Sequence, residues 1–237
     1  MPNATCKRIM TKDMKEISRM NLSELGIHIH FDESNIQSAK AMIIGPKDTP
    51  YENGVLFFKI TFPHNYPYSP PKVEYVSPST IRIHPNLYVG NLGNNYLGKV
   101  CLSILNTWSG PKWTTIMHIG SVLITIQSLL DNSPIHHEPG FEKEMKTSQR
   151  FINYNEIIKY DTFKTLIIKN CYMENEYLTV FKEEITEHIS KNSESIINTL
   201  QVLSKQQTKI YISNLYRLNV TVNYKDLLVK YKNLINI

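Results

Sequence analysis

The residue of this sequence with the clearest capacity for covalent chemistry is Cys101. It stands in the segment GKVCLSIL, after a Gly-Lys pair and before a short apolar run. Free cysteine is among the most frequently buried residue types, so this setting also fits an inert structural thiol. The Gly-Lys turn and Ser103 mark a point where the chain leaves regular structure and side chains become accessible. The combination favours a reactive thiol that acts as a nucleophile.

The other two cysteines, Cys6 and Cys171, lie far from Cys101 in the sequence, and none of the three forms a CxxC pair. This spacing indicates neither a disulfide framework nor a zinc site. The chain has 237 residues, enough for one domain with a substantial extension or for two small domains. Its first residues lack the apolar core of a signal peptide, which predicts a cytoplasmic protein, with entry to the nucleus left open.

A second segment of chemical interest, residues 62–86, is rich in proline and ends in His84-Pro85-Asn86. Proline fixes φ and lacks a backbone N–H, so this stretch cannot occupy a central strand. We expect it to cross the surface as a shaped loop.

The segments around these residues predict the elements that position them. Residues 1–22 read as a helix, residues 26–90 as four strands joined by Pro-rich turns, and residues 114–130 as a central apolar helix. Two further helices are predicted over 141–153 and 155–171, and the remainder is also predicted to be helical. The order indicates an α+β fold: an N-terminal helix, a four-stranded antiparallel meander, a central helix and a helical C-terminal extension.

The first helix has two distinct faces. Four basic residues recur at i, i+4, i+7 and i+11 and share one face: Arg8, Lys12, Lys15 and Arg19. The apolar residues expected to pack on the core lie opposite: Met10, Met14 and Ile17. The basic face is either an ordinary solvated surface or a dock for an acidic partner, and the pattern leaves both open.

The overall charge narrows the classes of partner. The formal net charge is +5 and the pI is about 8.9, a mild basic balance. This balance suits docking on acidic proteins and is too weak alone to indicate nucleic-acid binding. No stretch approaches the roughly 18 consecutive apolar residues of a membrane span, so we predict no membrane partner.

Taken together, the motifs resemble the ubiquitin-conjugating enzymes. The likeness runs in order over residues 5–150: the basic helix, PYENGVLFFKITFPHNYPYSPPKV, HPN, GKVCLSIL, a tryptophan and a long apolar helix. It implies the UBC fold and an acyltransferase in which Cys101 carries ubiquitin as a thioester and passes it to a lysine amine. Thioester exchange needs no strongly acidified thiol, and no histidine adjoins Cys101 as it would in a cysteine protease.

The resemblance also implies further site residues. Asn86 matches the asparagine of the HPN motif, which either donates to the oxyanion formed during transfer or braces its loop. His84 and Pro85 hold that loop in shape. Glu138 matches an acidic residue that orients and activates the incoming lysine, with His137 as a second proton acceptor, although an ordinary solvated loop fits this segment equally well.

The sequence departs from the family pattern between the asparagine and the cysteine. In most members only a few residues separate the two, whereas here LYVGNLGNNYLGKV lies between Asn86 and Cys101. The glycines and asparagines of this segment predict a flexible insertion.

Partner surfaces follow from the resemblance in the same way. Ubiquitin, a ubiquitin-activating enzyme, a ubiquitin ligase and a protein substrate are the implied partners, and no cofactor is implied because the activating enzyme consumes the ATP. The basic face defined above matches the surface used by the activating enzyme. Pro67, Tyr68 and Thr115 match positions that contact ligases. Trp113 is followed by Thr-Thr-Ile where relatives have Ser-Pro-Ala, which implies either that RING-type ligases do not bind or that the ligase is an unusual one.

The organisation predicted from the resemblance is a UBC core over residues 1–153 and a helical C-terminal extension over residues 154–237. The segments WSGPKW and NSPIHHEPGFE and the helical tail resemble a large-enzyme branch that can be charged by a non-standard activating enzyme. Two alternatives stay open: transfer of another ubiquitin-like modifier, and a non-catalytic ubiquitin-binding scaffold. The presence of Cys101 argues against the scaffold, and DNA binding has only the mild basicity in its favour.

Overall fold

The N-terminal helix docks by a face that only partly coincides with the predicted apolar side, because of the three residues expected on that side Ile17 alone packs against the core. The computed structural model describes residues 4–90 and 96–235. The helix comprises α1 (Ala4–Arg8), a π-helical turn η1 (Ile9–Asp13) and α2 (Met14–Met20). Met10 and Met14 are 51% and 38% exposed, so the prediction that they pack on the core is wrong. The buried face instead carries Thr5, Ile9 and Asp13, and two of these are polar residues that hydrogen-bond other segments.

The sheet is a five-stranded antiparallel meander whose spatial order follows the chain. A 3-10 turn, η2 (Leu22–Leu25), leads into its strands, which are β1 (Ile27–Phe31), β2 (Ser38–Ile44), β3 (Val55–Thr61), β4 (Lys72–Val76) and β5 (Leu97–Lys99). The α+β fold and the meander are therefore confirmed, and β5 is a strand beyond the four that were predicted.

Strand β5 lies in the segment that was predicted to be a flexible insertion. For its described part this prediction is wrong, because β5 pairs with β4 and Tyr88 donates its N–H to Lys99 O at 3.0 Å. Gly98 permits the close approach, since a Cβ there would lie 1.7 Å from Tyr88 O. Residues 91–95 of the same segment lie outside the described residues.

The central helix α3 (Ile119–Leu129) covers one face of the sheet with an apolar side that is fully buried at Ile119, Val122 and Ile126. The predicted start at Thr114 is too early. The segment before α3 is not helical, and Ile116 is 74% exposed. The helix begins where its backbone donors find acceptors, because the buried Asp13 carboxylate accepts the Ile119 N–H at 3.1 Å.

A long helical run follows the 3-10 turn η5 (Pro134–His137). It comprises α4 (Gln149–Asp161), the π-helical η6 (Thr162–Lys169) and α5 (Asn170–Tyr172). The predicted helix over 141–153 and the break near Asn153 are both wrong. Ser148 caps the helix by accepting the Phe151 N–H at 3.1 Å, so the helix starts there and continues through Asn153. The predicted domain boundary at 153/154 lies inside α4.

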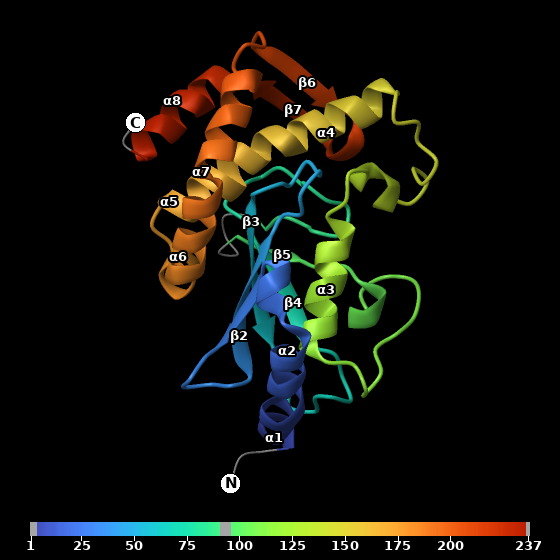
Figure 1. Cartoon of the computed structure of the whole chain (residues 1–237). Coiled ribbons are helices and arrows are strands. Elements are labelled where there is room, and N and C mark those ends of the chain that lie inside the picture. The colour runs from blue at the N-terminus through green and yellow to red at the C-terminus, as the bar shows by residue number, and fades with distance from the viewer. Residues whose placement is uncertain (1–3, 91–95, 236–237) are drawn as a thin grey trace.

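The extension covers the second face of the sheet. Its helices α6 (Glu176–Val180) and α7 (Lys182–Leu203) stand beside the sheet, and α4 crosses its upper end (Figure 1). On β3, Leu56 and Phe58 face the main core, whereas Phe57 packs on Tyr177 and Phe181 with ring centroids 5.0 and 6.1 Å away. This end of the sheet is therefore buried on both faces.

The chain ends in elements that were not all predicted. A hairpin of β6 (Lys209–Ser213) and β7 (Leu218–Val222), joined by a 3-10 turn η7 (Leu215–Arg217), packs on α4 and leads into α8 (Tyr224–Leu234). The extension is therefore not wholly helical. None of the described helices combines the length and the apolar character needed to cross a membrane.

One buried carboxyl joins the sheet side of the molecule to the extension. Asp161, at the end of α4, is 1% exposed, and its Oδ1 accepts the hydroxyls of Ser79 at 3.0 Å and Thr165 at 2.8 Å. Burial raises the pKa of Asp161 to about 6, because the apolar surroundings disfavour the charged form more than the two hydroxyls favour it.

We predict that Asp161→Asn stabilises the protein at neutral pH and not in acid. A carboxyl whose folded-state pKa lies above its unfolded value favours folding below the unfolded pKa, and this contribution is lost as the pH rises through the folded pKa. The variant removes the buried charge, so the free energy of unfolding should rise by about 2 kcal/mol at pH 7.5 and change little at pH 4. Urea denaturation at both pH values measures this, with the exposed Glu33→Gln as a control. Equal effects of Asp161→Asn at the two pH values would contradict it.

Candidate functional site

Cys101 and Asn86 lie side by side despite the segment between them. An isolated bridge pairs Leu87 with Val100, which places the two residues opposite each other. The Cys101 N–H donates to Asn86 O at 2.9 Å, and the Asn86 Nδ2 donates to Cys101 O at 2.7 Å. The side-chain amide of Asn86 therefore braces the backbone that carries the cysteine.

The thiol of Cys101 lies between β5 and the 3-10 turn η4 (Ser103–Leu105). The residue is 3% exposed, and no described residue forms a hydrogen bond with its sulfur. Burial raises the pKa of the Cys101 thiol, while the positive charges of Lys99 and Arg82 act in the opposite direction. This thiol is held as a neutral group, unlike the base-activated thiol of a protease.

The His84-Pro85-Asn86 turn is held rigidly from within. His84 is fully buried and its Nδ1 accepts the Asn86 N–H at 3.0 Å. Burial lowers the pKa of His84 well below its usual value, so the ring is neutral and carries its proton on Nε2. The buried Tyr51 hydroxyl donates to Ile83 O at 2.7 Å and fixes the approach to the turn.

An arginine that the sequence did not single out closes this turn. Arg82 donates from Nη2 to Pro85 O, and its guanidinium lies between two tyrosine rings, 3.5 Å from the centroid of Tyr88 and 4.2 Å from that of Tyr216. Two rings facing one guanidinium make a cation–π sandwich that fixes the charge near Cys101. Tyr216 belongs to the C-terminal hairpin, so no local pattern could have joined these residues.

The two proton-handling candidates face different partners. Glu138, which follows η5, accepts a hydrogen bond from the Tyr216 hydroxyl through Oε2. His137 packs on His84 with ring centroids 4.9 Å apart and the rings tilted by 45°, and its Nε2 pairs with Asp131 Oδ2 at 3.0 Å. His137 thus reaches the His-Pro-Asn turn through His84, whereas Glu138 is connected to it through Tyr216 and Arg82. The His137 ring is engaged with Asp131 and not with Glu138.

The predicted basic face of the first helix divides into two parts. Lys15 and Arg19 are exposed, and Lys12 is half-buried. The Arg8 side chain is only 15% exposed, pairs with Asp13 at 3.4 Å and donates to Met117 O at 2.9 Å. Arg8 therefore binds within the chain, because the buried carboxylate of Asp13 attracts it.

The loops that carry Pro67, Tyr68 and Thr115 form one exposed edge. Trp113 donates from Nε1 to Pro67 O at 2.7 Å, which ties the two loops together. Tyr68 and Ile116 are 81% and 74% exposed. Ile116 was expected inside a helix, and its exposure next to Thr115 is a feature that the sequence analysis missed.

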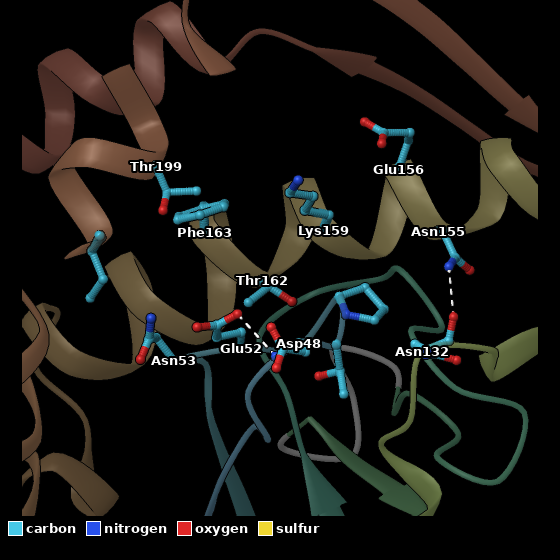
Figure 2. A pocket seen from close by; sticks show the side chains of 13 residues that line it. Asp48, Glu52, Asn53, Asn132, Asn155, Glu156, Lys159, Thr162, Phe163 and Thr199 are labelled. Carbon is cyan, nitrogen blue, oxygen red and sulfur yellow. Dashed lines mark hydrogen bonds between the residues drawn. The ribbon is translucent and has the colours of Figure 1, made fainter. Parts of the chain in front are cut away.

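The described surface carries several hollows. One of about 490 Å³ borders β5 and is lined by Lys99, Val100 and Leu105, which precede and follow Cys101 in the sequence. Another, of about 390 Å³, lies between the segment 48–53, α4 and α7 (Figure 2). Its lining is mixed, with Glu52, Lys159 and Asn155 beside the apolar Phe163 and Ile196, and it does not include Cys101. Cys101 lines neither hollow, and the first is bordered by its neighbour Val100.

An antiparallel meander backed by one central helix, with a cysteine paired to a His-Pro-Asn turn, defines the class of ubiquitin-conjugating proteins. Comparison with known families agrees. The model of the ubiquitin-conjugating enzyme family matches residues 9–159. The chain belongs to this family.

Individual relatives extend the comparison. The chain is 42% identical over 144 residues to ubiquitin-conjugating enzyme E2 Z of Danio rerio, a match that covers 60% of this chain and 42% of that protein. It is 33% identical over 238 residues to the Arabidopsis thaliana protein designated ubiquitin-conjugating enzyme E2 39, covering 90% of this chain and 67% of that one. A solved ubiquitin-conjugating enzyme domain from Toxoplasma gondii is 26% identical with a TM-score of 0.49, covering 67% of this chain and 99% of that one. The chain thus spans less than half of the E2 Z protein.

We predict that Asn86→Ala destabilises the fold by about 1–3 kcal/mol, because it leaves the buried Cys101 carbonyl without its side-chain donor. Urea denaturation measures the change. Asn219→Ala, at an exposed position of β7, is the matched control and should stay within about 0.5 kcal/mol of the wild type. If both variants have the same free energy of unfolding, the Asn86 side-chain hydrogen bond contributes nothing to stability.

Proposed function

We propose that this chain is an active ubiquitin-conjugating enzyme, which accepts ubiquitin on Cys101 and transfers it to a lysine amine. The observation that carries the proposal is the paired Cys101–Asn86 backbone, which holds the cysteine at a fixed point against the His-Pro-Asn turn. Membership of the family supports it.

The charging step is an exchange between two thioesters. The Cys101 sulfur attacks the C-terminal carbonyl carbon of ubiquitin, a new C–S bond forms, and the thiolate of the activating enzyme leaves and takes up the proton that Cys101 gives up. The bonds made and broken are equivalent, so the step requires positioning more than driving force. Lys99 and Arg82 favour the attacking thiolate electrostatically. ATP is consumed by the activating enzyme, and this chain uses no cofactor.

The transfer step needs a neutral amine. A lysine is almost wholly protonated near neutral pH, since its ordinary pKa is about 10.4. The Glu138 carboxylate attracts the ammonium group and takes one proton, after which the amine attacks the thioester carbonyl. The C–N bond forms, the C–S bond breaks, Cys101 leaves as the thiolate, and the second amine proton returns it to the thiol. Asn86 serves this step by holding the cysteine backbone in place.

Partner docking completes the proposal. Lys12, Lys15 and Arg19 present positive charge to an activating enzyme, which is of the non-standard type that the resemblance implies. The exposed edge formed by Tyr68, Thr115 and Ile116 is the surface for a ligase, because large exposed apolar side chains act as interface anchors.

We predict that the purified chain, incubated with ubiquitin, ATP and an activating enzyme, forms a thiol-sensitive adduct one ubiquitin heavier. Cys101→Ser should give a thiol-resistant ester instead, and Cys171→Ala should charge like the wild type. Reducing and non-reducing gels distinguish these products. If no activating enzyme charges the chain with ubiquitin but one does so with another ubiquitin-like modifier, the modifier in the proposal is wrong. If nothing is loaded, the chain is a non-catalytic scaffold.

We predict that the double variant Tyr68→Ala/Ile116→Ala reduces ligase-stimulated transfer at least about tenfold, because it removes two interface anchors. The rate of discharge to free lysine without ligase should not change. The measurement is single-turnover discharge with a RING-type ligase domain that stimulates the wild type, and Val202→Ala, at an exposed site on α7, is the control. Undiminished stimulation would locate the ligase surface elsewhere.

A further inference from the structure

The tip of the C-terminal hairpin reaches the residues around Cys101. The hairpin lies along α4 (Figure 1), and its connecting turn η7 carries Tyr216. The Tyr216 ring packs edge-to-face on Tyr154 of α4, with centroids 6.0 Å apart at 66°. Tyr154 in turn donates its hydroxyl to Arg82 O at 2.9 Å. A residue from the end of the chain is thereby built into the neighbourhood of the thiol.

Tyr216 contacts two charged groups of opposite sign. Its hydroxyl donates to Glu138 Oε2, and its ring lies 4.2 Å from the Arg82 guanidinium. Burial raises the pKa of the Tyr216 phenol far above its usual value, so the hydroxyl keeps its proton and acts as a donor to the carboxylate. One side chain therefore fixes both the positive charge near Cys101 and the carboxylate on the amine side.

The backbone adopts an unfavourable conformation at Tyr216 and at the next residue. Tyr216 has φ +59° and Arg217 has φ +53°, the left-handed region that residues other than glycine and asparagine seldom adopt. Strained conformations of this kind persist where the surrounding contacts impose them, and they cluster at functional sites. The contacts imposed here are those with Glu138 and Arg82.

One oxygen of the Glu138 carboxylate, Oε1, is left available to an amine. Glu138 is half-buried, its Oε2 is taken by Tyr216, and its Oε1 forms no hydrogen bond with any described residue. A cationic amine can therefore approach Oε1 while Oε2 stays anchored.

We propose that Tyr216 is a positioning residue for the amine-accepting step, which holds Glu138 in the orientation that receives the lysine ammonium group. The inference rests on the proposed function. It assigns to the C-terminal extension a direct part in transfer, in which the extension supplies the donor that fixes the carboxylate.

The test compares charging with discharge in Tyr216→Phe, which removes the hydroxyl and keeps the ring on Arg82. Charging by the activating enzyme should match the wild type, because that step does not use Glu138. The single-turnover rate of discharge to saturating lysine should fall about tenfold, the effect expected for the loss of a hydrogen bond to a charged group. Discharge to hydroxylamine should stay within about twofold of the wild type, because that amine is neutral near pH 7 and needs no carboxylate to release a proton.

Two further variants separate positioning from general damage. Tyr211→Phe, on the same hairpin and beside Lys209, should discharge to lysine at the wild-type rate. In a Glu138→Ala background, adding Tyr216→Phe should cause no further loss, because the partner through which Tyr216 acts is already gone.

The outcomes separate a failure of the proposed function from a failure of the inference about Tyr216. A wild type that is never charged at Cys101 overturns the proposed function itself. A charged wild type with Tyr216→Phe discharging to lysine at the normal rate overturns only the inference about Tyr216. Equal losses with lysine and hydroxylamine, or additive losses with Glu138→Ala, assign Tyr216 a merely structural role and also overturn it.

Discussion

The rest of the structure depends on one constraint: both faces of β3 are buried at its N-terminal end. Val55 to Phe58 are four consecutive buried residues, and alternation along a strand sends two of them to each face of the sheet. Helix α3 can cover only one face of the sheet. The other must be covered by Tyr177, Phe181 and their neighbours from the extension. Leaving one large aromatic side chain in water costs about 1.5–3 kcal/mol, so the extension is part of the fold.

This arrangement also determines the chemistry around Cys101. Because α4 and the hairpin must pack against the core, Tyr154 and Tyr216 arrive at Arg82, and Arg82 in turn closes the His-Pro-Asn turn. The thiol is shielded and mainly protonated, because burial raises its pKa more than the charges of Lys99 and Arg82 lower it. The packing of the extension and the environment of the cysteine are thus two results of one arrangement.

Local sequence patterns predict part of the fold and part of the site. Alternating apolar residues predict the first four strands correctly, and the HPN and GKVCLSIL segments identify Asn86 and Cys101 without reference to the rest of the chain. The pairing of these two residues was not predictable, because it depends on Gly98 admitting β5 next to Tyr88. The segment around residues 209–222 does alternate with period two, and its hairpin was missed because the helical pattern on either side dominated.

Other features depend on contacts between residues far apart in the sequence. Arg8 has the spacing of a surface-facing residue, yet the buried Asp13 removes it from the surface. Glu138 matches a family position by its sequence context, whereas its anchor, Tyr216, is supplied by a turn with left-handed backbone that no propensity favours. Such contacts are set by tertiary packing, which outweighs local preference where a side chain joins two elements.

The position of Tyr216 along the chain has a consequence for the order of events in biosynthesis. The ribosome synthesises the chain from its N-terminus, and the segments that emerge first begin to fold first. The meander and Cys101 leave the ribosome well before the hairpin that anchors Glu138 and encloses Arg82. In a nascent chain the contacts of Glu138 and Arg82 with Tyr216 are therefore completed only after the hairpin has been made.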